Sequence, residues 1–101
     1  MTEAGERPVR VGIAWYRADQ WTRLREVSVD VPELEATWSE WHAVAERQLR
    51  ELQEQGIAPR KVPVDIDDLV RWCESTGSAI DGAARSAYAG LLLQHGRSEP
   101  G

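Results

Sequence analysis

The residues with the clearest chemical potential follow two segments that have the alternating pattern of β-strands. Tyr16 and Arg17 lie at the carboxyl end of the first segment, and Asp65 and Asp67 lie at that of the second. In parallel α/β layers, ligands bind beyond the carboxyl ends of the strands, where these side chains would meet. An arginine beside carboxylates suits an anion such as phosphate bound with magnesium. In the alternative interpretation, Arg17 pairs with an aspartate and the other aspartates cap helices.

Tryptophan is the second residue type of interest, because the chain has five tryptophans, two tyrosines and no phenylalanine. Trp15 would lie at the end of a strand, and Trp72 on a helix, so the two could wall one pocket. The alternative is that the tryptophans fill the core in the place of phenylalanine. The candidate ligand-binding residues are therefore Trp15, Tyr16, Arg17, Asp65, Asp67 and Trp72.

Other groups that could do chemistry lack the neighbours that chemistry requires. Cys73 is the only cysteine, which excludes an internal disulfide and a zinc site built from several cysteines. His42 and Glu46 have the spacing of a helical pair, without a further ligand nearby in the sequence. Glycine-rich phosphate loops, nucleophile elbows and His-Glu-x-x-His motifs do not occur. We therefore predict no catalytic residue, no metal site and no cofactor.

Composition limits which partners and which cellular compartment are expected. A formal net charge of −5 disfavours nucleic acid as a partner, because such binding depends on Lys and Arg neutralising phosphates. No apolar run approaches the ~18 residues needed to cross a bilayer, which argues against a membrane. The first ten residues do not resemble a secretory signal, so we expect a cytoplasmic protein.

Alternating residues predict a first strand over Val9 to Tyr16. Val11 and Ile13 would lie on one face, and the small residues Gly12 and Ala14 on the other. A helix could approach the small-residue face closely, so we expect helices on both faces of the sheet. A second strand is predicted over 60–66, where Pro63 indicates an edge position or pairing on one side only.

Helical spacing and capping residues predict four helices. A short helix begins near Ala18, and a loop follows at 27–31. The longest helix runs over about 38–55 and begins with a capping box, Thr37 to Glu40. Gly56 marks its end. A third helix, capped by Asp65 or Asp67, extends to about Thr76. A fourth helix, capped by Asp81, runs to about His95.

These elements predict a helix-rich α/β fold with the order β-α-α-β-α-α. Residues 9–95 would form a single domain between a flexible segment at 1–8 and a flexible tail at 96–101. The long crossover favours parallel pairing of the two strands. Because two strands make a marginal sheet, either a third strand is present or a second subunit completes the layer.

The last helix suggests how a second subunit would bind. Leu92 and Leu93 point in different directions around the helix, and Gly90 adds a position where another helix could approach closely. A domain of this size would have difficulty burying every leucine of the helix. The candidate interface residues are Gly90, Leu92 and Leu93.

Several short segments resemble a family of small bacterial proteins of unknown function. They are Ile13 to Arg17, Thr37 to Trp41, Val62 to Asp67, the pair Trp72-Cys73, and Asp81 to Arg85. The resemblance covers most of the chain from Val11 to Ala89. It implies a bacterial, cytoplasmic, single-domain protein and implies no activity, ligand or cofactor.

Two functions remain open on the sequence alone. The first is a non-catalytic interaction or regulatory module that acts as a homodimer or as an accessory to another protein, and it predicts an apolar surface around Leu92 and Leu93. The second is a binding protein for a small anion or nucleotide, or a minor enzyme, that uses Tyr16, Arg17 and Asp65. It predicts a cavity with Arg17 inside.

Overall fold

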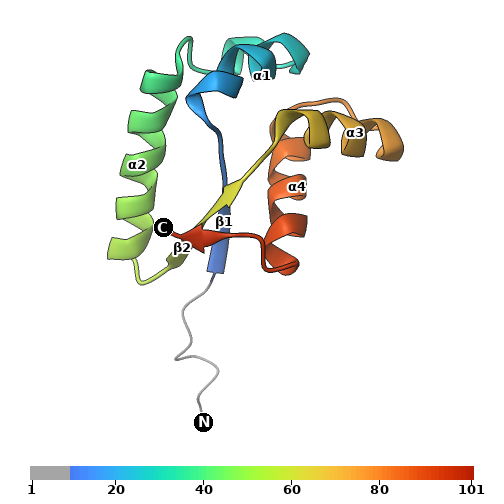
Figure 1. Cartoon of the computed structure of the whole chain (residues 1–101). Helices are drawn as coiled ribbons and strands as arrows, with labels where there is room; N and C mark the ends of the chain where they lie inside the picture. The colour runs from blue at the N-terminus through green and yellow to red at the C-terminus, as the bar shows by residue number, and fades with distance from the viewer. Residues whose placement is uncertain (1–9) are drawn as a thin grey trace.

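The computed structural model describes residues 10–101 as a small domain in which helices enclose a three-stranded mixed sheet (Figure 1). The expectations for residues 1–9 lie outside the described residues. In chain order the elements are β1 (Arg10–Trp15), the 3-10 helix η2 (Ala18–Gln20), α1 (Trp21–Val27), the 3-10 helix η3 (Val31–Glu33), α2 (Trp38–Glu54), β2 (Ala58–Pro63), α3 (Ile66–Thr76), α4 (Gly82–Gln94) and β3 (Glu99–Pro100).

The expected parallel pair is present at the centre of the fold. β1 and β2 pair in parallel along their whole lengths, from Arg10 beside Ala58 to Trp15 beside Pro63. A parallel pair requires a long crossover, which α1 and α2 supply. The helix-rich α/β class predicted from the sequence is therefore confirmed.

A third strand, β3, completes the sheet within one copy of the chain. Glu99 and Pro100 pair antiparallel with Lys61 and Arg60, and the Gly101 amide donates to the Pro59 carbonyl at 3.1 Å. This strand lies in the segment that the sequence analysis assigned to the tail. Glutamate and proline are depleted in strands, so their identities gave no strand signal.

β2 is the central strand, which corrects the edge position that Pro63 suggested. The Val64 amide donates to the Trp15 carbonyl of β1, so the nitrogen of the preceding Pro63 faces the other side of β2. β3 reaches only Arg60 and Lys61 on that side. The missing N–H of Pro63 therefore costs the sheet no hydrogen bond.

The capping residues predicted from the sequence begin and end the helices in the structure. Thr37 and Glu40 form the capping box of α2 through reciprocal bonds of 3.2 Å. Asp65 and Asp81 cap α3 and α4 by accepting from amides three residues ahead. Gly77 ends α3 with φ of +71°, a conformation that glycine adopts without strain.

Helices cover both faces of the sheet, with α2 on one side and α4 on the other (Figure 1). A Cβ atom at Gly12 would lie 3.1 Å from Val62 and 3.2 Å from Leu93 of α4. Glycine thus permits the close approach of α4 to β1, as the small-residue face predicted. On the opposite face, Val11 and Ile13 lie beside α2.

The main core lies between the sheet and helices α1, α3 and α4. Its most buried members include Leu24, Val62, Ile66, Leu69 and Cys73. Leu92 also belongs to this core and is 7% exposed. This corrects the expectation of an apolar surface around Leu92 and Leu93, because Leu92 belongs to the core and the half-buried Leu93 packs against it. Among residues 10–101, each helix is too short or too polar to cross a bilayer.

Candidate functional site

The carboxyl ends of β1 and β2 bring several of the predicted site residues together. Arg17, Asp65 and Asp67 line one open hollow of about 310 Å³, together with Asp19, Gln20, Arg23 and Ile66. The parallel pairing explains this convergence, since β1 and β2 both have their carboxyl ends at the same end of the sheet.

The charges of this hollow are already paired with one another. Arg17 donates to Asp19 at 3.1 Å, and Arg23 approaches Asp67 at 3.4 Å. Asp65 is occupied as the cap of α3. Within the described residues, no group of three or more His, Cys, Asp or Glu side chains is arranged to hold a metal ion. Surface ion pairs and helix caps account for the residues that suggested a magnesium-phosphate site.

Trp15 and Trp72 lie apart from the hollow and from each other. The Trp15 ring packs edge-on against Trp41, with 5.2 Å between the ring centroids. The Lys61 ammonium lies 4.7 Å from the centroid of the Trp15 ring. Trp72 instead packs against Tyr88 of α4 at 5.3 Å. The two tryptophans therefore do not wall a common cavity.

An aromatic cluster joins β1, α1 and α2. Trp41 lies at its centre, with ring centroids between 5.2 and 6.3 Å from those of its neighbours Trp15, Tyr16, Trp21 and Trp38. The indole N–H of Trp38 donates to the Tyr16 carbonyl at 2.8 Å, and that of Trp21 donates to the Glu35 carbonyl at 3.2 Å. Trp21 and Trp38 therefore fill space and satisfy their polar atoms within the fold.

His42 and Cys73 have structural surroundings. His42 stacks on Trp38 at 4.5 Å and lies 3.4 Å from Glu46, which confirms the expected pair on the rim of α2. Cys73 is 1% exposed. Burial, with a smaller contribution from Asp81, raises the pKa of its thiol, so the reactive thiolate is disfavoured.

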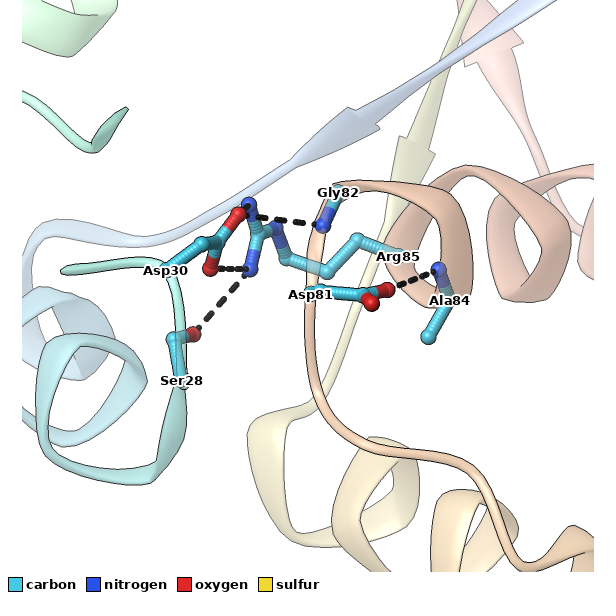
Figure 2. A network of polar contacts seen from close by, with 6 residues as sticks. All are labelled: Ser28, Asp30, Asp81, Gly82, Ala84 and Arg85. Atoms are coloured by element: carbon cyan, nitrogen blue, oxygen red, sulfur yellow. Dashed lines mark hydrogen bonds and ion pairs between the residues drawn. The ribbon is translucent and has the colours of Figure 1, made fainter. Parts of the chain in front are cut away.

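The strongest polar network lies elsewhere, between the loop after α1 and the start of α4 (Figure 2). Two amines of Arg85 donate to the two carboxylate oxygens of Asp30 at 2.9 and 2.7 Å, and the side chains are only 11% and 13% exposed. Arg85 also donates to the buried Ser28 hydroxyl at 3.1 Å, while Asp30 accepts from the Gly82 amide. This network ties two distant segments of the chain together.

The electrostatics of this network fix its charge states. The hydrogen bond from Arg85 is the largest influence on Asp30 and holds the pKa of that carboxyl below its ordinary value. Arg85 is the only charged residue of α4. A single arginine within an apolar helix is the signal that would have indicated a buried pair, although the sequence does not name its partner.

Tyr16, near this pair, should make the protein less stable in alkali. Burial raises the pKa of its hydroxyl from 10.0 to about 12. The stabilisation is complete below pH 10.0 and is lost as the pH rises through about 12, because phenolate forms more easily in the unfolded chain. The full loss corresponds to about 2.7 kcal/mol. Urea unfolding at increasing alkaline pH should show this decline, and Tyr16→Phe should remove it; an equal decline in both proteins would contradict the assignment.

The free edge of β1 is the other notable feature of the described chain. Within residues 10–101, β1 pairs with β2 alone, and each of its residues is at least partly exposed. Beside this strand lies a hollow of about 320 Å³ between β1 and α2, lined by three apolar and three polar residues. Its lining is Val11, Ile13, Gln48, Glu51, Leu52 and Gln55. The sequence analysis assigned the edge position to the second strand, because the segment that forms β3 and makes β2 central gave no strand signal.

Comparisons of the chain with protein-family models, with curated proteins and with solved structures give no match.

Proposed function

We propose that the protein is a non-catalytic interaction module that self-associates along the free edge of β1. The observation that carries this proposal is a six-residue strand with a neighbour on one side only, in the part of the chain from Arg10 onward. An open strand edge pairs readily with another strand, and such pairing is a common mode of protein recognition.

The backbone of β1 supports pairing with a second copy. The Trp15 carbonyl accepts from Val64 on the β2 side. Because the N–H and C=O groups of one residue share a side and alternate along a strand, those of Gly12 and Ala14 point outward. Two copies related by a two-fold axis would present the same donors and acceptors to each other. The product is one continuous sheet.

Both faces beside the edge suit close contact. The hollow at Val11 and Leu52 offers apolar surface on the α2 side. On the other side, Gly90 lies one turn before Leu93, which contacts β1, and a Cβ atom at Gly90 would meet nothing within 4 Å. The exposed positions of α4 are uncharged: Gly82, Ala83, Ser86, Ala87 and Gln94. Two α4 helices could therefore approach across the axis without electrostatic repulsion.

The alternative, a small-ligand site at the strand ends, has less support. Arg17 and Asp65 do share a hollow, but the arginine pairs with Asp19 and the aspartate caps a helix. Cytoplasmic location and membership of the family that the sequence resembles stay predictions.

Self-association is tested by measuring mass over a concentration series by sedimentation. The wild-type protein should shift from its 11.4 kDa monomer toward twice that mass. Ala14→Pro removes an outward N–H while retaining a Cβ atom, and should weaken the dimer at least tenfold. Ala14→Ser keeps the N–H and should weaken the dimer much less.

A second variant separates association from folding. Gly90→Glu places a charge on the uncharged face of α4, and glutamate favours helix more than glycine does, so the fold should keep its stability. The dimer should nevertheless weaken, because the two added charges face each other. A wild-type protein that stays at 11.4 kDa at high micromolar concentration would refute the proposal.

A further inference from the structure

Three arginines of the described chain are half-buried, and two of them have partners. Arg85 binds Asp30, and Arg60 donates to the Ser98 hydroxyl and carbonyl. Arg25 of α1 has no hydrogen bond or ion pair to any residue in 10–101, and its Nε atom is buried without a partner. Arg25 is therefore a half-buried cation without a counter-charge among the described residues.

Arg25 lines a hollow of about 250 Å³ between α1 and the segment that carries η3. Trp21, which is 4% exposed, contributes apolar surface, as do Val31 and Ala36. Thr22 supplies a hydroxyl, and the exposed Glu26 completes the lining. The hollow therefore combines one half-buried cation with a compact apolar wall.

We propose that this hollow binds a small organic carboxylate with a compact apolar group. The terminal amines of Arg25 would hold the carboxylate, since a guanidinium matches the geometry of a carboxylate with two parallel hydrogen bonds. Trp21 and Val31 would contact the apolar group. A counter-ion at Arg25 also stabilises a cation that the fold leaves without one.

Glu26 defines the selectivity of the site. Its carboxylate lines the same hollow and carries no ion pair within the described residues, so it opposes any second negative charge on the ligand. Monocarboxylates are therefore favoured over dicarboxylates or phosphate. The exposure of Glu26 means that solvent screens this repulsion and limits its effect to a few-fold.

The experiment is a titration of isotope-labelled protein with 3-methylbutanoate, followed by the NMR signals of the Arg25 side chain and the Trp21 indole. Saturable shifts are expected at millimolar concentrations. Arg25→Gln keeps a similar length without the charge and should weaken binding at least tenfold, whereas Glu26→Gln should tighten it about two- to five-fold. The neutral analogue 3-methylbutanamide should bind at least tenfold more weakly than the carboxylate.

Shifts that do not saturate, or equal affinity for the amide and the carboxylate, would overturn the proposal. So would an Arg25→Gln protein that is folded by circular dichroism and binds as the wild type does. The outcome is independent of self-association, because none of the lining residues belongs to β1, α2 or α4. Sedimentation of Arg25→Gln should match the wild type.

Discussion

Replacing Arg85 with alanine should lower the free energy of unfolding by about 3–5 kcal/mol, because it leaves a buried carboxylate without its counter-charge. The Asp30 carboxylate would keep only the Gly82 amide as a hydrogen-bond donor. The Ser28 hydroxyl would lose the hydrogen bond that it accepts from Arg85. The two segments joined by the network, the loop after α1 and the first turn of α4, would also lose their main polar connection (Figure 2). Chemical denaturation at neutral pH measures this loss.

An exposed ion pair of the same chemical type provides the matched control. Arg71 pairs with Asp68 on the surface of α3, where the side chains are 69% and 46% exposed. Arg71→Ala should therefore cost no more than about 1 kcal/mol. Equal losses for the two variants would show that burial does not strengthen the Arg85 pair.

The pH dependence of the same network has a defined sign. Because the pKa of Asp30 is lowered in the folded protein, its contribution is complete above the unfolded-state pKa of about 4. It is lost as the pH falls through the lower, folded-state pKa. Asp30→Asn should be less stable than the wild type at neutral pH, and its stability should vary less in acid. A parallel acid dependence in both proteins would assign the loss to other carboxylates.

Local chemistry made much of the fold predictable. The spacing of Val62, Val64 and Ile66 indicated one buried face, and all three are buried. The caps at Thr37 and Asp81 act within a few residues of themselves, so the sequence alone identifies them. The parallel pairing followed from the length of the crossover.

Features that depend on contacts between distant segments were not predictable in this way. β3 consists of two residues that rarely form strands, and its pairing with Lys61 places β2 at the centre. The partner of Arg85 lies 55 positions earlier in the chain. Nothing in the local pattern around Asp30 distinguishes it from a surface aspartate.

The same distinction between local and distant contacts applies to the candidate sites. The convergence of Arg17 with Asp65 and Asp67 followed from strand direction, but their ion pairs and caps depend on side-chain positions. The sequence left open whether Trp15 and Trp72 wall one pocket or fill the core. Trp15 of β1 packs against Trp41 of α2, whereas Trp72 of α3 packs against Tyr88 of α4, so the two tryptophans do not meet.

Truncating Trp41 to alanine should cost about 3–5 kcal/mol of unfolding free energy, the range for removing a large packed aromatic side chain. Its ring contacts Trp15 of β1, Trp21 of α1 and Trp38 of its own helix. No other ring of the described chain joins these three elements. The loss should appear in chemical denaturation, accompanied by a reduced near-ultraviolet circular dichroism signal.

Trp72→Ala is the matched control, because Trp72 is also half-buried but packs against a single aromatic ring, Tyr88. The difference between the two variants isolates what the cluster adds beyond the area of one indole, since each aromatic pair contributes about 0.5–1.5 kcal/mol beyond burial. Trp41→Ala should therefore be the more destabilising change. If Trp72→Ala proved equally costly, the ring contacts of Trp41 would add nothing beyond the burial of one indole, and the aromatic cluster would stabilise the attachment of α2 no more than the buried Ala45 and Leu49 do.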